Sequence, residues 1–118
     1  TKPERNNLLR GDTVSVNYIG KTLDKKIFDS SIEQVARDNG IFSAGRKYQP
    51  LRYAVGYGFT ITGFEFAISM MHAGEKATVI FPSRLGYGTQ ASGGIPSNSP
   101  LIFELELVQV KKGPNLNP

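Results

Sequence analysis

LIFELEL (residues 101–107) has apolar side chains at every second position, Leu101, Phe103, Leu105 and Leu107. Its leucines and phenylalanine fall on one face and its two glutamates on the other, which is the period of a β-strand with one face buried. Residues 13–18 and 77–81 alternate in the same way, and we expect Gly20 to end the first of these strands and Pro82 the second. Strands that are polar on one face are typical of an antiparallel sheet with that face in water.

The main helical pattern lies between these strands. Thr62 followed by Glu65 matches a capping box, in which each side chain binds a free backbone amide at the helix start. Apolar side chains then recur at helical spacing, at Phe64, Ala67, Ile68 and Met71. We expect Gly74 to end this helix.

A second, shorter helix is predicted from Ser31 to about Asp38. Ser31 and Gln34 would form its capping box, and Gly40 would end it. The strands and the amphipathic helix together predict an α+β fold with the helix packed on one face of an antiparallel sheet.

Composition limits the chemistry of the chain. Its 118 residues, of which 39% are hydrophobic, suit a single domain spanning residues 1–118. The absence of cysteine excludes disulfides, thiolate nucleophiles and cysteine-ligated metals, and one histidine makes other metal sites improbable. The net charge of +4 comes from scattered basic pairs, which favours a solvated surface over nucleic-acid binding. No apolar run approaches the roughly 20 residues of a transmembrane helix.

His72 is the only histidine and therefore the only ready base for a serine or threonine nucleophile. Its place near the end of the predicted helix is more typical of an interaction with the helix dipole. We therefore expect the protein to act through shape and apolar surface.

Three groups of short motifs stand in an informative order. They are VNYIG (16–20) with FDSS (28–31), then GFE (63–65) with Met71, Gly74 and Glu75, then LGYG (85–88) with Ile95-Pro96 and LIFELEL (101–107). Their order and spacing closely resemble the FKBP family of peptidyl-prolyl cis/trans isomerases. The resemblance covers roughly residues 9–112, which would form the domain core between two frayed tails.

The resemblance implies a twisted antiparallel sheet wrapped around one short helix, with a hydrophobic pocket that takes in a proline side chain. The residues that it assigns to catalysis are Tyr18, Phe28, Asp29, Ile61, Phe64, Tyr87 and Phe103. Those that it assigns to substrate binding are Tyr53 and Ile95, with Leu51 and Thr60 at the rim. In the family the backbone amide of Ile61 and the hydroxyl of Tyr87 hydrogen-bond to the bound peptide. The implied partners are proline-containing polypeptides and the macrolide inhibitors of the family, with no metal or cofactor.

Core packing is the alternative explanation for each of these aromatic residues. Tyr18 and Tyr87 favour a pocket, because a buried phenol needs a partner for its hydroxyl group and a pocket mouth provides one. Asp29 would orient Tyr18 through a hydrogen bond, with a plain turn or cap as the alternative.

Two departures from the family pattern bear on function. Phe64 replaces the usual tryptophan at the pocket floor, which makes the floor smaller. The segment 32–49 is longer than in minimal members, so the arginine that pairs with the pocket aspartate is either Arg46, our first candidate, or Arg37. These departures motivate a second hypothesis, an FKBP-fold binding or chaperone module with little catalytic role.

The sequence says little about location. The missing start methionine and the lack of cysteine are compatible with a trimmed protein of the bacterial cell envelope, periplasmic or lipoprotein-anchored. We expect that location, with the cytoplasm as the alternative.

Overall fold

The computed structural model describes residue 8 and residues 10–88 and 95–113, so the predicted tails lie almost wholly outside the described residues. The five strands are β1 (Thr13–Thr22), β2 (Ile27–Ser30), β3 (Leu51–Ala54), β4 (Lys76–Phe81) and β5 (Leu101–Lys111). The helices are α1 (Glu33–Asp38), α2 (Thr62–Ile68) and a 3₁₀ turn, η1 (Ser83–Leu85).

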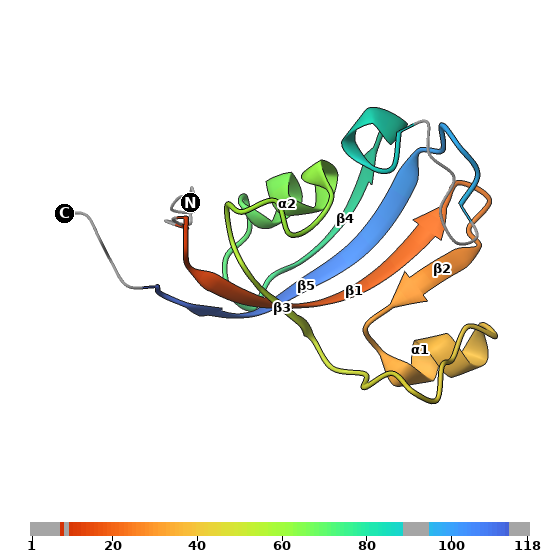
Figure 1. The fold of residues 1–118 in the computed structure, drawn as a ribbon, viewed down its shortest axis with the longest axis horizontal. Helices are drawn as coiled ribbons and strands as arrows, with labels where there is room; N and C mark the ends of the chain where they lie inside the picture. The colour runs from red at the N-terminus through yellow and green to blue at the C-terminus, as the bar shows by residue number, and fades with distance from the viewer. Residues whose placement is uncertain (1–7, 9, 89–94, 114–118) are drawn as a thin grey trace.

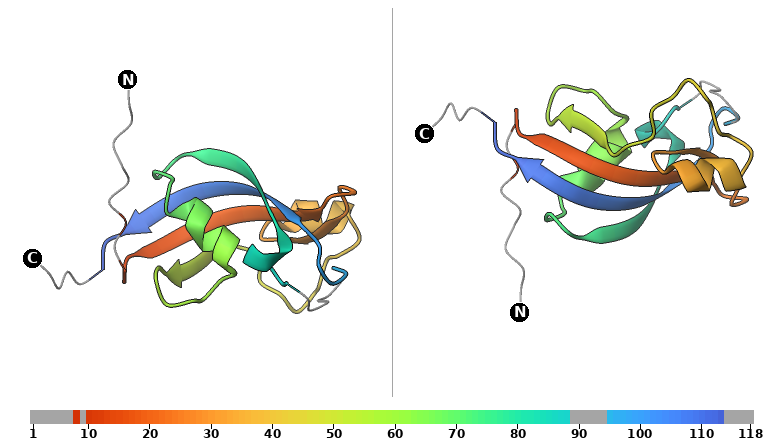
Figure 2. Two further views of the ribbon diagram at one scale, coloured as in Figure 1. Left: turned by 90° about the horizontal axis from the view of Figure 1, so that it is seen from above. Right: turned by 90° about the horizontal axis from the view of Figure 1, so that it is seen from below.

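The sheet is built around β1. Its strand order is β2-β1-β5-β4, and every pairing is antiparallel. One edge of β1 is shared by two short strands, because β3 pairs with residues 13–16 and β2 with residues 19–21. The strands curve around α2, whereas α1 lies near β2 at the other end of the sheet (Figure 1). Figure 2 shows α2 crossing the strands on one face only.

The core forms where that face meets α2. The side chains of β1 and β5 that the alternation placed inside are buried, and α2 adds Phe64, Ala67 and Ile68. On the other face of β5, Glu104 and Glu106 are partly exposed. The α+β fold predicted from the alternation is therefore confirmed.

Gly20 does not end β1, contrary to the sequence prediction. The strand continues to Thr22, and Gly20 is a buried position inside it. A Cβ atom on this residue would lie 2.6 Å from Cζ of Phe28, so the aromatic ring packs directly on the glycine backbone. A glycine inside a strand often marks a site where another part of the molecule approaches the backbone closely, and Gly20 is such a site.

The capping box predicted for α2 is also not formed. The N-cap is Ile61 rather than Thr62, and no side chain caps it. The Glu65 carboxylate accepts a hydrogen bond from the amide of Gly56 in the preceding loop instead. The helix ends at Ile68, earlier than predicted. Gly74 lies in the turn before β4, where its amide donates to the carbonyl of Leu107 on β5.

The short helix α1 exists, but its predicted capping box does not. Ile32 is its N-cap, without a side-chain cap, because the Ser31 hydroxyl is engaged elsewhere. That oxygen accepts a hydrogen bond from the Tyr18 amide at 3.0 Å and donates one to Asn17 at 2.9 Å. Ser31 thus ties the end of β2 to β1. No helix in the described part of the chain is long and apolar enough to cross a membrane.

Candidate active site

A cavity of about 520 Å³ opens beside the N-terminal end of α2. Its lining comes from β1, β2, β3, β5, α2 and the loops before α2 and after η1. The lining residues are Tyr18, Phe28, Asp29, Leu51, Gly58, Phe59, Thr60, Ile61, Phe64, Tyr87 and Phe103. The wall is mostly aromatic and aliphatic, which suits an apolar ring.

Aromatic rings packed edge to face make the inner part of the cavity. Phe64 is 3% exposed, and its ring centroid lies 5.7 Å from Tyr18 and 5.4 Å from Phe103, both in T-shaped geometry. Phe103 meets Phe28 in the same way at 5.8 Å. Each contact presents the positive edge of one ring to the negative face of another, a favourable arrangement that also fixes the rings. The cavity therefore has a rigid apolar interior.

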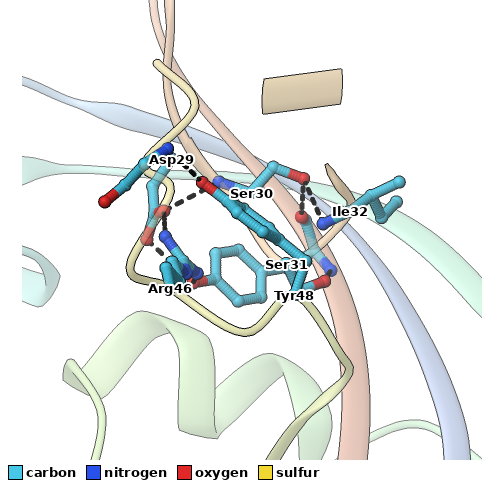
Figure 3. A network of polar contacts seen from close by, with 8 residues as sticks. Asp29, Ser30, Ser31, Ile32, Arg46 and Tyr48 are labelled. Carbon is cyan, nitrogen blue, oxygen red and sulfur yellow. Dashed lines mark hydrogen bonds and ion pairs between the residues drawn. The ribbon is translucent and has the colours of Figure 1, made fainter. Parts of the chain in front are cut away.

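Two polar side chains of the lining, Tyr18 and Asp29, form a network with Arg46, which lies outside the lining. The Tyr18 hydroxyl donates to Oδ2 of Asp29 at 2.8 Å, and Arg46 binds Oδ1 of Asp29 at 2.7 Å and the Tyr18 oxygen at 3.1 Å. Figure 3 shows Arg46 and Asp29 directed at one another. The expectation that Asp29 binds Tyr18 is confirmed, and the partner of Asp29 is Arg46 rather than Arg37. Arg37 pairs with Glu33 on α1.

Burial and the nearby Asp29 carboxylate raise the pKa of the phenols in this wall. Burial first, and then the hydrogen bond to Asp29, raise the pKa of Tyr18 to about 12. Burial and the charge of Asp29 also raise the pKa of the Tyr87 phenol. For Arg46, burial lowers the pKa, but the hydrogen bonds to Asp29 and Tyr18 outweigh it and the pKa is raised. Both tyrosines are therefore protonated at neutral pH, and the Tyr18 hydroxyl donates a hydrogen bond to Asp29.

Ile61 stands where the loop becomes α2. It has extended backbone angles and lines the cavity with its partly buried side chain. Its carbonyl accepts from the Glu65 amide at 3.2 Å, but its own amide donates to no backbone carbonyl in the described ranges. An amide at a helix start that has no intrahelical acceptor is a ready donor for a ligand oxygen.

The cavity gathers most of the residues that the sequence assigned to it. Tyr53 and Ile95 are the exceptions, since both are buried in the core behind the lining, at 4% and 5% exposure. Tyr53 packs against Phe59 and Phe64 and so supports the wall from behind.

Gly58 and Phe59 line the cavity although sequence reasoning missed them. Phe59 is 62% exposed and stacks on Tyr53 with ring centroids 5.7 Å apart. The loop that holds it bends at Gly56 and Gly58, whose φ angles are +93° and +71°. Phe59 directly follows these two turn-forming glycines, and a phenylalanine in such a loop is poorly placed for a core, which is the sequence signal that could have marked it as a rim residue.

A second hollow of about 410 Å³ lies on the outer face of the sheet. Its lining includes Asn17, Thr78 and Glu104, whose positions on β1, β4 and β5 alternate with those that face the core. Ile32, just before α1, also lines it. Tyr18 is the only aromatic residue in its lining, and its carboxylates are partly exposed. The 520 Å³ cavity is therefore the candidate active site.

An antiparallel sheet curved around one short helix, with an aromatic cavity at the start of that helix, defines the class of this domain. Two solved structures share it. A peptidyl-prolyl cis-trans isomerase of Pseudomonas syringae matches 95% of this chain and 68% of its own at TM-score 0.65 and 29% identity. FkpA of Escherichia coli matches 94% and 45% at TM-score 0.70 and 31% identity.

The chain belongs to the FKBP-type peptidyl-prolyl cis-trans isomerase family, whose sequence model matches residues 5–108. A short-type peptidyl-prolyl cis-trans isomerase of Methanocaldococcus jannaschii is 45% identical over 70% of this chain and 52% of its own. FK506-binding protein 2 of Yarrowia lipolytica is 40% identical over 86% and 62%. The chain thus spans between half and two thirds of the length of these two relatives.

Proposed function

We propose that this domain accelerates the cis/trans isomerisation of X–Pro peptide bonds in polypeptides. The observation that carries the proposal is the aromatic cavity at the start of α2, which offers a proline ring an apolar site beside neutral hydrogen-bond donors. Family membership supports the same activity.

The reaction suits a site with few charged groups. Rotation about the X–Pro bond faces a barrier of roughly 18 to 20 kcal/mol because the twisted amide loses its resonance. No bond is broken, so neither a nucleophile nor a proton acceptor is required. The twisted amide has less charge separation than the planar one, and a site that excludes water favours it.

We assign the roles by position in the cavity. Phe64, Phe103 and Phe28 hold the proline ring and keep water from the amide. The amide of Ile61 and the hydroxyl of Tyr87 donate to carbonyl oxygens of the substrate and hold the chain on either side of the rotating bond. A 10⁴-fold acceleration requires about 5.4 kcal/mol, which shape complementarity, desolvation and a few hydrogen bonds can supply.

The Tyr18, Asp29 and Arg46 group fixes one wall of this site. The Asp29 carboxylate lies beside the apolar rings, and its negative charge is stabilised there by Arg46 and by the Tyr18 hydroxyl. We assign it a supporting role, and substitution of Asp29 by asparagine should weaken catalysis by loosening Tyr18.

Refolding of a protein whose slow phase is limited by proline isomerisation tests the proposal. The slow phase should become faster in proportion to the concentration of the domain, and Phe28→Ala should reduce the effect while the domain stays folded. If the domain binds the unfolded chain without changing the slow phase, it is a binding module that retains the fold and the pocket.

The same cavity should bind the macrolide inhibitors of the family. Competition between such a ligand and a proline-containing peptide, followed by isothermal titration, tests whether the two share one site. Binding of both at once would place one of them elsewhere.

A further inference from the structure

A row of stacked side chains runs from α1 through the segment between α1 and β3, and only its last member, Arg46, is part of the polar network at the cavity wall. The guanidinium carbon of Arg37 lies 3.8 Å from the centre of the Phe42 ring. Phe42 stacks on Tyr48 with centroids 5.6 Å apart and planes at 17°. On Tyr48 in turn lies Arg46, whose guanidinium carbon is 4.8 Å from the ring centre. The row thus consists of a stacked pair of rings with one arginine at each end.

Both ends of this row are anchored. Arg37 is bound through Nε to Glu33 on α1 at 2.8 Å. Arg46 reaches Asp29 and Tyr18 in the cavity wall at 2.7 and 3.1 Å. The row therefore connects α1 to the cavity, although none of its four members lines the cavity.

The backbone around Tyr48 is fixed as well. The amide of Ser43 donates to the Tyr48 hydroxyl at 3.1 Å, and the amide of Arg46 donates to the Ser43 carbonyl at 3.1 Å. The second bond closes the turn that carries Arg46 and the first joins Tyr48 to the start of that turn, while stacking holds the ring against the guanidinium. Figure 3 shows Tyr48 and Arg46 together below Asp29.

Arg46 needs such support because its side chain is long and 38% exposed. A free arginine samples many rotamers, and ordering it for two polar contacts costs conformational entropy. A ring stacked on the guanidinium restricts it to the conformations that reach Asp29, and the cation–π attraction adds to this restriction.

We propose that Tyr48 is a positioning residue of the isomerase site, acting through Arg46 on Asp29 and Tyr18, with Phe42 and Arg37 fixing the far side of its ring. This inference rests on the proposed function, since it concerns the same cavity. It gives the long segment 32–49 a role in the site, that of holding one wall of the cavity in place.

The test compares Tyr48→Leu with Tyr48→Phe, which keeps the ring and loses only the hydroxyl. Tyr48→Leu should lower kcat/KM for a short proline peptide by about two- to fivefold, the range of an exposed cation–π contact. Tyr48→Phe should retain most of the activity. Tyr57→Leu is a matched control, because Arg10 stacks on Tyr57 at 4.9 Å in a pair that does not reach Asp29.

A double-mutant cycle separates positioning from general destabilisation. In an Arg46→Met background, Tyr48→Leu should have almost no further effect on kcat/KM, because the residue through which it acts is gone. If the two substitutions multiply, or if Tyr48→Leu leaves kcat/KM at the wild-type value, the inference is wrong. Should Tyr48→Leu fail to fold, Phe42→Leu removes the support of the ring and replaces it in the same cycle.

NMR relaxation of the Arg46 Nε group gives a second readout that does not depend on catalysis. Its order parameter should fall in Tyr48→Leu and stay near the wild-type value in Tyr48→Phe. An unchanged order parameter in Tyr48→Leu contradicts the inference alone, whereas a wild-type domain without isomerase activity contradicts the proposed function alone.

Discussion

Gly20→Ala should damage the cavity from inside the sheet. Gly20 is buried in β1, and an added Cβ atom would lie 2.6 Å from Cζ of Phe28 and 3.0 and 3.1 Å from its two Cε atoms. Carbon atoms in contact lie about 3.5 to 4.0 Å apart, so the ring has to move by roughly 1 Å. Phe28 lines the cavity, so a displaced ring has space to move into there. The ring should therefore shift into the space that we assign to proline.

The magnitude follows from the cost of overpacking, which is typically about 1 to 3 kcal/mol of unfolding free energy. Because Phe28 can move toward an open cavity, we expect a loss of stability near the lower end, together with a clear loss of kcat/KM. Urea denaturation measures the first and a peptide isomerisation assay the second. Gly45→Ala is the control, since a Cβ atom there meets nothing within 4 Å.

Gly20→Ala made in a Phe28→Leu variant tests this explanation, because leucine lacks the Cζ atom that a Cβ on residue 20 would meet. Gly20→Ala should cost much less stability in Phe28→Leu than in the wild type, since residues in contact are not additive. Equal costs in the two backgrounds would refute the reasoning and would show that Gly20 matters for its own backbone conformation.

Three further outcomes are expected. Phe64→Trp should tighten macrolide binding, measured by calorimetry, because a larger floor adds apolar contact worth about 25 cal/mol per Å²; weaker binding in a stable variant would mean that Phe64 is not the floor. The catalytic efficiency should be flat from pH 6 to pH 8 and unaffected by His72→Ala, since no proton transfer is involved; a sigmoidal profile lost in His72→Ala would overturn the mechanism. The pKa of Tyr18 is about 12 in the folded state and about 10 in the unfolded state, so the unfolded state loses this proton first as the pH rises. The free energy of unfolding should therefore be unaffected by Tyr18 below about pH 10 and should fall between pH 10 and pH 12. Tyr18→Phe should make that alkaline fall shallower in urea titrations, and an unchanged slope would contradict the assignment.

The strands that carry the core could be predicted because their signal is local. Alternation over 13–18, 77–81 and 101–107 identified β1, β4 and β5, whose one-sided burial imposes a period of two. The short strands β2 and β3 have four residues each, and sequence reasoning missed them as strands. Both pair with one edge of β1, and such a short run has too few positions to display a period.

The predicted helix caps failed for a tertiary reason. The Ser31 hydroxyl and the Glu65 carboxylate both bind backbone amides, as cap residues do, but they bind those of Tyr18 and Gly56 in other parts of the chain. A local sequence motif cannot show that a backbone amide from another part of the chain will bind the same side chain instead.

The cavity was predicted more completely than the contacts around it. Its aromatic lining was assigned from the resemblance to the FKBP family, which left Arg46 and Arg37 open as partners of Asp29, and the folded chain pairs Asp29 with Arg46. Likewise Phe59 reaches the rim through a loop that the glycines shape, and no periodic pattern marks such a residue.

The most direct test of the central claim is the rate of cis-to-trans exchange in a short X–Pro peptide, measured by NMR exchange spectroscopy with catalytic amounts of the domain. The rate should rise linearly with enzyme concentration and should drop in Phe28→Ala and Tyr87→Ala while both variants keep the folded spectrum. An exchange rate equal to that of the free peptide, at enzyme concentrations where the peptide is bound in the cavity, would contradict the claim.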